Sequence, residues 1–312
     1  MGRPVLLFLL LPLLIACEQS EPAPAEETLG KAQPVSLNDS FSDYWYNGEA
    51  ELNTYRLEQA RYGDIHEGHA TLIFVTEPFS KSKQVKLDQP QKAGADKVSV
   101  MKLNFLRKFN TGIYPYSTMM SSFHPIALES PSTTLKTSFS AQEWCGQTYF
   151  QLNQESEYDY RYQGYSYFES EGDVSGELKG VYLEDGLWNL LRIQSDALPL
   201  GKIKILPASS FIRLRHHPIK AYQAEAQLKE LEGGRMQYVV DYSELSRSLR
   251  ITFEAAFPHR IVEWQETMSD RSGKEISTMA TLMSSQRSPY WQKNGKRDRA
   301  LRSSLQLPVD HQ

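Results

Sequence analysis

The spacing of apolar and polar residues along this chain predicts a mainly β protein. From about residue 39 onwards, runs rich in Val, Ile, Thr, Tyr and Phe alternate with clusters of Gly, Asn and Pro, a pattern typical of strands separated by turns. The turns recur about every 8–15 residues, which favours an antiparallel sheet over βαβ units. The predicted strand regions are 69–79, 96–110, 134–153, 158–172, 220–231, 236–243, 247–257, 260–269 and 275–285.

One segment has a helical period instead. In "LEDGLWNLLRIQSDALPLG" the leucines fall three and four positions apart, and Glu184 and Asp185 occupy the first turn, where the helix dipole favours acids. The pattern predicts a helix of about three turns that crosses one mouth or face of the sheet. The expected fold is therefore a curved antiparallel sheet or half-closed β-barrel with one short helix packed against it. A hairpin turn is expected at Gly233-Gly234.

The N-terminus predicts export and lipid attachment. Residues 1–16 carry Arg3 and then an apolar run that Pro12 interrupts, which is typical of a signal peptide and too short to span a bilayer. Leu14-Ile15-Ala16-Cys17 looks like a bacterial lipobox, so we expect cleavage between Ala16 and Cys17 and a diacylglycerol on the Cys17 thiol. The alternative is an ordinary secreted protein with a leftover cysteine. This covalent lipid is the only cofactor expected, and it makes the membrane a partner.

Two segments flank the expected β domain of residues 39–292, which is one unit or two sub-sheets with a break near 175–200. Residues 17–38 are rich in Glu and Pro without aromatics, and predict an extended tether. Residues 293–312 predict a basic, flexible tail. The formal net charge of −4 gives no reason to expect a nucleic acid as partner.

The sequence offers no convincing catalytic or metal-binding set. In "HEGH" the two histidines are three positions apart before a strand, which points them to opposite faces. Cys145 follows Trp144 and Glu143, neighbours that do not stabilise a thiolate, so a packed thiol is expected. A thiol enzyme that pairs Cys145 with a distant histidine is the alternative. Motifs for phosphate loops, dinucleotides and nucleophile elbows are absent from the sequence.

Aromatic residues are the best candidates for a binding site. "YDYRYQGYSYF" places Tyr158, Tyr160 and Tyr162 on one face of a strand. Such a row either forms a wall that faces an apolar ligand or packs against the neighbouring strand. The candidate ligand-binding residues are Trp45, Trp144, Cys145, Tyr160 and Tyr162.

Several stretches carry a family resemblance: "SDYWYNGEAEL", "LEQARYGDIHEGHA", "RKFNTGIYPYS", "EWCGQTYFQLN", "SYFESEGD" and "FEAAFPHRIVEWQET". Together they resemble a family of Gram-negative envelope lipoproteins that is often labelled "septum formation inhibitor Maf". Maf enzymes are cytoplasmic α/β nucleotide pyrophosphatases with a phosphate loop near the start, which this chain lacks, so pyrophosphatase activity is not expected. The C-terminal half is similar to periplasmic curved-sheet domains of unknown function.

The expected function combines the anchor, the β pattern and the aromatics. Glu18 after the lipobox cysteine resembles outer-membrane lipoproteins, so the expected location is the cell envelope, on the outer membrane and facing the periplasm. The concave face is expected to bind an apolar or amphipathic molecule, such as a lipid, or an envelope protein, without chemistry. A structural envelope protein with no small ligand is a further alternative.

Overall fold

The computed structural model describes residues 2, 39–126, 133–269 and 273–308. The chain divides after Gly30 into two units, and every helix and strand lies in the second. The predicted signal peptide, the tether and Cys17 lie outside the described residues. In the described part, no helix is long and apolar enough to cross a bilayer.

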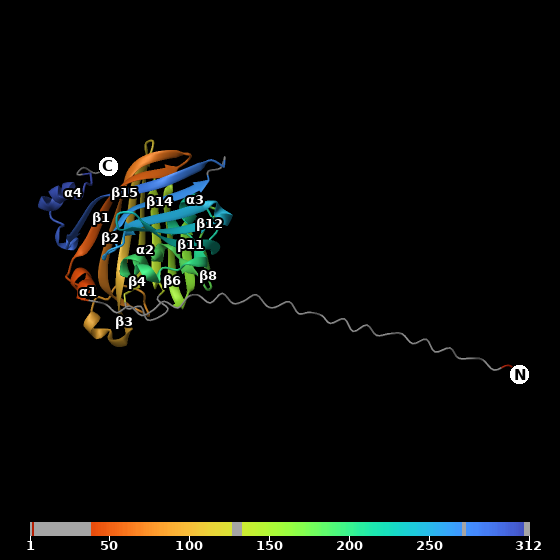
Figure 1. The fold of residues 1–312 in the computed structure, drawn as a ribbon, viewed down its shortest axis with the longest axis horizontal. Coiled ribbons are helices and arrows are strands. Elements are labelled where there is room, and N and C mark those ends of the chain that lie inside the picture. The colour runs from red at the N-terminus through yellow and green to blue at the C-terminus, as the bar shows by residue number, and fades with distance from the viewer. Residues whose placement is uncertain (1, 3–38, 127–132, 270–272, 309–312) are drawn as a thin grey trace. The chain divides into compact units, whose positions relative to one another are not determined.

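Fifteen strands form one sheet within the described residues, which confirms the prediction of a mainly β, curved antiparallel sheet (Figure 1). The first eight strands are β1 (Ala50–Arg61), β2 (Asp64–Ser80), β3 (Lys97–Thr111), β4 (Tyr114–Pro125), β5 (Lys136–Glu143), β6 (Gly146–Ser156), β7 (Asp159–Ser166) and β8 (Val174–Leu178). The others are β9 (Tyr182–Leu183), β10 (Gly201–Leu206), β11 (Tyr222–Leu231), β12 (Arg235–Tyr242), β13 (Arg247–Glu254), β14 (Ile261–Ser269) and β15 (Glu275–Ser288).

The sheet consists of two meanders, β1–β8 and β9–β15, which join where β1 pairs with β15. Neighbouring strands are antiparallel except β9 and β10. The two edge strands, β8 and β9, are consecutive in the chain with only residues 179–181 between them. Because this connection is so short, the sheet must curl until its edges approach each other. The alternative of two sub-sheets with a break near 175–200 is therefore wrong: the seam between the edges lies there, within one sheet.

Four α-helices accompany the sheet in the described part: α1 (Asp39–Trp45), α2 (Glu184–Ile193), α3 (Ser209–Arg215) and α4 (Leu301–Ser304). All ten residues of α2 are buried, and its partners come from strands of both meanders, so α2 lies inside the curve of the sheet. The predicted helix is confirmed, and α3 is an additional short helix that the sequence pattern did not reveal.

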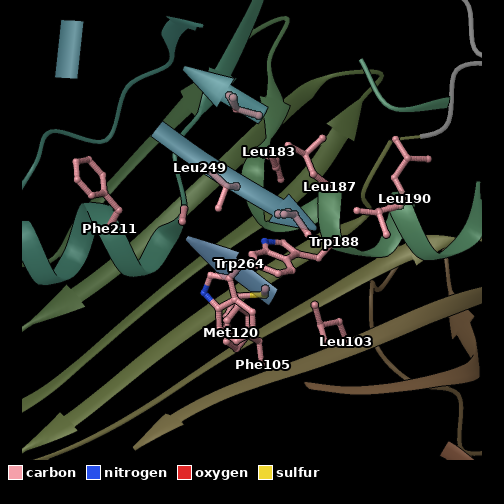
Figure 2. Packing of buried hydrophobic residues seen from close by; sticks show 14 of the residues in the cluster. Leu103, Phe105, Met120, Leu183, Leu187, Trp188, Leu190, Phe211, Leu249 and Trp264 are labelled. Atoms are coloured by element: carbon pink, nitrogen blue, oxygen red, sulfur yellow. The ribbon is translucent and has the colours of Figure 1, made fainter. Parts of the chain in front are cut away.

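Aromatic rings hold α2 against the strands. Trp188 of α2 meets Phe105 with 5.1 Å and Trp264 with 5.5 Å between ring centroids (Figure 2). These near-perpendicular arrangements are favourable for aromatic pairs. The helix thus occupies part of the concave face of the sheet, the face on which the sequence placed an apolar or amphipathic ligand.

The C-terminal segment packs on the outside of the sheet. Thr54 of β1 donates a hydrogen bond to the carbonyl of Leu305 at 2.5 Å, and Gln306 donates to the carbonyl of Met283 at 2.9 Å. The Leu305 side chain also packs on a small apolar cluster with Ala50 and Leu52. The prediction of a flexible tail over 293–312 is therefore wrong for residues 293–308, because its few apolar residues find an apolar surface.

Gly186 allows α2 to approach the segment before β5. A Cβ atom at this position would lie 2.0 Å from Oγ1 of Thr134, which is hydrogen-bonded to Nδ1 of His124. Gly186→Ala is expected to lower the free energy of unfolding by about 1–3 kcal/mol, because the overlap outweighs the gain of about 1 kcal/mol in helix propensity. Urea denaturation measures this change. Adding Thr134→Ala should restore part of the loss, and a Gly186→Ala variant more stable than the parent would refute the explanation.

Candidate functional site: an apolar rim at the hairpin end

Three consecutive hairpins turn at the same end of the sheet. β1–β2, β3–β4 and β5–β6 are each joined by two residues, namely Tyr62-Gly63, Gly112-Ile113 and Trp144-Cys145. The six strands are neighbours in the sheet, so the three turns form a row. We call this end of the sheet the hairpin end.

Each of these turns exposes a large apolar side chain. Tyr62 is 66% exposed, Ile113 84% and Trp144 65%, and Tyr167, which follows β7, is 47% exposed. Two-residue turns normally favour Gly, Asn and Asp because of their backbone geometry. The turns alone do not require residues of this kind, so we call Tyr62, Ile113, Trp144 and Tyr167 the hairpin rim and treat it as the candidate site.

Tyr62 shows that the rim is maintained at a cost. Its backbone has φ 55°, in the left-handed region that bulky residues rarely adopt, and Gly63 follows with φ 90°. Such conformations cost about 1–3 kcal/mol and are found preferentially at functional sites. A tyrosine where asparagine would suit the turn better is therefore an indication of function.

The rim residues Tyr62 and Trp144 are held in place by contacts with tyrosines of β4. The hydroxyl oxygens of Tyr62 and Tyr116 lie 2.7 Å apart. The ring centroids of Tyr114 and Trp144 are 5.8 Å apart. The backbone N–H of Cys145 donates to the Tyr114 hydroxyl at 2.9 Å. These contacts connect the first three turns into one ordered surface.

Tyr167 is fixed by a glycine. Its ring lies over Gly146, where an added Cβ atom would come within 2.4 Å of it. The side chain also reaches the thiol of Cys145, and burial with this hydrogen bond raises the pKa of Tyr167 to about 12. Gly146 therefore permits the close approach that joins the fourth rim residue to the third turn.

An open groove of about 320 Å³ adjoins the rim across β2–β5. Trp144 and Tyr116 give it an apolar part, whereas Glu67, His69 and Lys108 give it a polar part. Partial burial and the nearby Lys108 lower the pKa of His69, so this histidine is neutral at neutral pH. An amphipathic molecule matches this combination better than a fully apolar one.

The structure separates the residues that the sequence proposed as one site. Trp144 and Cys145 lie together at the hairpin rim, and Cys145 is exposed, so the expectation of a packed thiol is wrong. Trp45 is buried at the other end of β1, where the centroid of its ring lies 6.4 Å from that of Phe74. Tyr160 is buried in the core and Tyr162 is half-buried on β7, with its ring 6.0 Å from Phe150.

The rim residues Tyr62 and Ile113 were not proposed from the sequence, whereas Tyr167 belongs to the aromatic stretch "YDYRYQGYSYF" but was not among the five candidate residues. The strand pattern predicts sheet positions from alternation, but the exposure of a turn residue depends on where neighbouring hairpins end. A signal was present in "RYGD" and "NTGIYP", where a large apolar residue stands beside the glycine of a turn between strands.

Three buried ion pairs lie inside the sheet among the described residues. Glu51 binds Arg192, Glu184 binds Arg247 and Glu266 binds Arg107, and all six side chains are buried. The cavity between α2, α3 and the strands measures about 10 Å³, the space that one water needs. Around α2 the interior is thus closely packed, and this cavity has no room for a ligand larger than a water molecule.

The described residues do not bring metal-ligating side chains together. No group of three or more His, Cys, Asp or Glu suited to a metal ion occurs among them. In "HEGH", Nε2 of His66 lies 3.1 Å from the carbonyl oxygen of Arg61, and His69 faces the groove. Within the described residues, Cys145 has hydrogen-bonding contacts with Tyr114, Glu143 and Tyr167, and these include no histidine that would activate the thiol.

The fold and the rim define a barrel-like, single-sheet β domain with an exposed apolar end. Comparison with known families finds no match, and comparison with curated proteins finds none either. Among solved structures, the chain is similar to a beta-barrel-like protein of the domain of unknown function DUF1849 from Brucella abortus. The TM-score is 0.43 at 8% identity, over 76% of this chain and 96% of that one. The resemblance to envelope lipoproteins stays a prediction.

Proposed function

We propose that this protein is a binding protein of the bacterial envelope that acts without chemistry and is held on the membrane by a lipid on Cys17. In this proposal the hairpin rim binds an apolar or amphipathic molecule of the envelope. The observation that carries it is the row of exposed large apolar residues on three consecutive tight turns. The predicted location on the outer membrane, facing the periplasm, is part of the proposal.

The energetics of the rim favour binding. Removing a large apolar side chain from water contributes about 1.5–3 kcal/mol, so several rim residues together can support a micromolar complex. The contacts of Tyr62 and Trp144 with β4 reduce the entropy that is lost on binding, because these side chains are already ordered. The proposal places the ligand at the rim and its groove instead of the concave face, which α2 partly occupies.

The test uses the full-length chain with Cys17→Ser, so that no acyl chain contributes to binding. Isothermal titration with the uncharged surfactant dodecyl maltoside, below its micellar concentration, should give saturable binding. Trp144→Ser and Tyr62→Asn should each weaken the affinity by about tenfold, which corresponds to about 1.4 kcal/mol. Asparagine is chosen at position 62 because it suits the turn, so the hairpin is expected to form.

Trp291→Ser is the matched control, because Trp291 is also exposed but follows β15 and is not part of the rim. It should leave the affinity unchanged. If Trp291→Ser weakens binding as much as Trp144→Ser, or if the parent chain shows no binding, the rim is not the site. The latter result would favour a structural envelope protein with no small ligand.

A further inference from the structure

Arg61 is a buried cation directly beneath the hairpin rim. It is the last residue of β1, adjacent to Tyr62, and only 8% of its surface is exposed. Its recorded hydrogen bonds all go to neutral oxygens: the carbonyl of Leu214, the Tyr62 hydroxyl at 3.2 Å and the Tyr116 hydroxyl at 3.5 Å. Its Nε atom is buried and has no hydrogen-bond partner within the described part of the chain.

The other four buried arginines among the described residues differ from Arg61 because each has a carboxylate as counterion. The pairs are Arg107–Glu266, Arg192–Glu51, Arg213–Glu171 and Arg247–Glu184. For Arg61, the residues that the structure describes provide no such ion pair. A buried charge without a counterion is costly. The rings of Tyr62 and Tyr116, 4.4 and 5.4 Å from the guanidinium carbon, offset part of this cost but do not neutralise the charge, so Arg61 can still attract an anion.

The surroundings of Arg61 are positively charged. A cavity of about 20 Å³ beside it is lined by three arginines, Arg61, Arg107 and Arg215, and by one acid, Glu266, which already binds Arg107. The cavity has room for about one water, so an anion would lie outside it, beside Arg61. The paired hydroxyls of Tyr62 and Tyr116 lie 3.2 and 3.5 Å from the Arg61 guanidinium and can also donate hydrogen bonds.

We propose that Arg61 binds the phosphate group of the ligand whose apolar part lies on the hairpin rim. A guanidinium group presents two parallel N–H donors that match two phosphate oxygens, and this charge-assisted pairing is among the strongest hydrogen-bonding arrangements in proteins. The inference rests on the proposed function, because it assigns the polar end of the same ligand. The competing explanation is that Arg61 only caps the carbonyl end of α3 through Leu214.

The test compares two surfactants with the same tail, dodecyl phosphate and dodecyl maltoside, by isothermal titration of the full-length Cys17→Ser chain. The parent chain should bind dodecyl phosphate roughly tenfold to a hundredfold more tightly. Arg61→Gln should abolish this preference and bring the affinity for dodecyl phosphate down to about that for dodecyl maltoside. Arg56→Gln, an exposed arginine on the same strand, is the control and should change neither affinity.

Two further measurements extend the test. One uses inorganic phosphate to distinguish the free ion from a lipid head group, and the other uses a second variant in case Arg61→Gln does not fold. Inorganic phosphate that binds alone, with an affinity that Arg61→Gln removes, identifies the free ion as the ligand; phosphate that binds only on a dodecyl tail identifies a lipid head group. If Arg61→Gln does not fold, Arg61→Lys keeps the charge without the bidentate geometry, and it should retain only part of the preference.

The outcomes separate the two proposals. A parent chain that binds neither surfactant refutes the proposed function. A chain that binds both surfactants equally refutes the phosphate site alone. An Arg61→Gln variant with a lower melting temperature but an intact preference for dodecyl phosphate would show that Arg61 is only a cap for α3, and would overturn the inference.

Discussion

Replacing Arg192 by methionine is expected to lower the free energy of unfolding by about 3–5 kcal/mol, because it leaves Glu51 as a buried carboxylate without its counterion. The two side chains form a bidentate pair, with N–O distances of 2.6 and 2.8 Å, and neither is exposed. Arg192 also donates to the carbonyl of Pro258 at 2.9 Å. The variant therefore loses a connection among α2, β1 and the turn before β14.

The pH dependence of this pair has a defined sign. Burial opposes the ionisation of Glu51, but the Arg192 guanidinium and the hydrogen bonds to the carboxylate outweigh it and lower the pKa of Glu51 from 4.5 to about 2. A depressed pKa in the folded state contributes stability above pH 4.5 that is lost as the pH falls towards 2. The difference between the parent chain and Arg192→Met should therefore shrink over this interval.

Urea denaturation at several pH values measures both effects. Arg56→Met replaces an exposed arginine of β1 and is expected to change the free energy of unfolding by no more than about 0.5 kcal/mol. The double variant Glu51→Gln/Arg192→Met should recover much of the loss, because no unpaired charge remains. A loss for Arg192→Met no larger than that for Arg56→Met would contradict the explanation.

Asp185→Asn is expected to change the pH profile of stability in the opposite direction. Burial, together with the nearby Glu184, raises the pKa of Asp185 from 3.8 to about 7, although hydrogen bonds from Ser209 oppose the change. A raised pKa of an acid means that the folded state binds the proton more tightly than the unfolded state. The contribution to stability is therefore full below pH 3.8 and is lost as the pH rises through 7.

The expected size of this effect is about 4 kcal/mol, because one pKa unit corresponds to about 1.4 kcal/mol. The difference between the free energies of unfolding of Asp185→Asn and the parent chain should grow by this amount between pH 4 and about 7.5. Asp241→Asn, on the half-buried face of β12, is the control for the general effect of removing an acid. Parallel profiles for Asp185→Asn and the parent chain would refute a buried, proton-binding Asp185.

The sequence pattern predicted the sheet and α2, because strand alternation and leucine spacing are local properties. It did not predict what the charged residues of α2 do. Glu184 meets Arg247 and Arg192 meets Glu51, partners that are 63 and 141 positions away in the chain. Such pairs depend on the register of strands from both meanders, which no local pattern contains.

The candidate site was predicted only in part, for a related reason. Trp144 and Cys145 were among the predicted residues because an aromatic residue stands beside a cysteine in the sequence, and both lie at the hairpin end. Trp45 and Tyr160 were predicted for the same site but belong to the core. Aromatic content alone does not distinguish a ligand surface from packing, since both use large apolar side chains. The structure distinguishes a surface from packing through the positions of the turns. Only the order of the strands in the sheet shows that Tyr62, Ile113 and Trp144 lie at the same end.

The position of α2 between the meanders has a consequence for how the chain folds. The helix belongs to the second meander, but Glu51 and the Met101 carbonyl, which bind it, belong to the first. Hairpins can form from local contacts, whereas burial of the helix needs both halves. Neither meander can bury α2 alone, so we expect the union of β1 with β15 and the enclosure of the helix to occur as one cooperative step, with a single unfolding transition for residues 39–308.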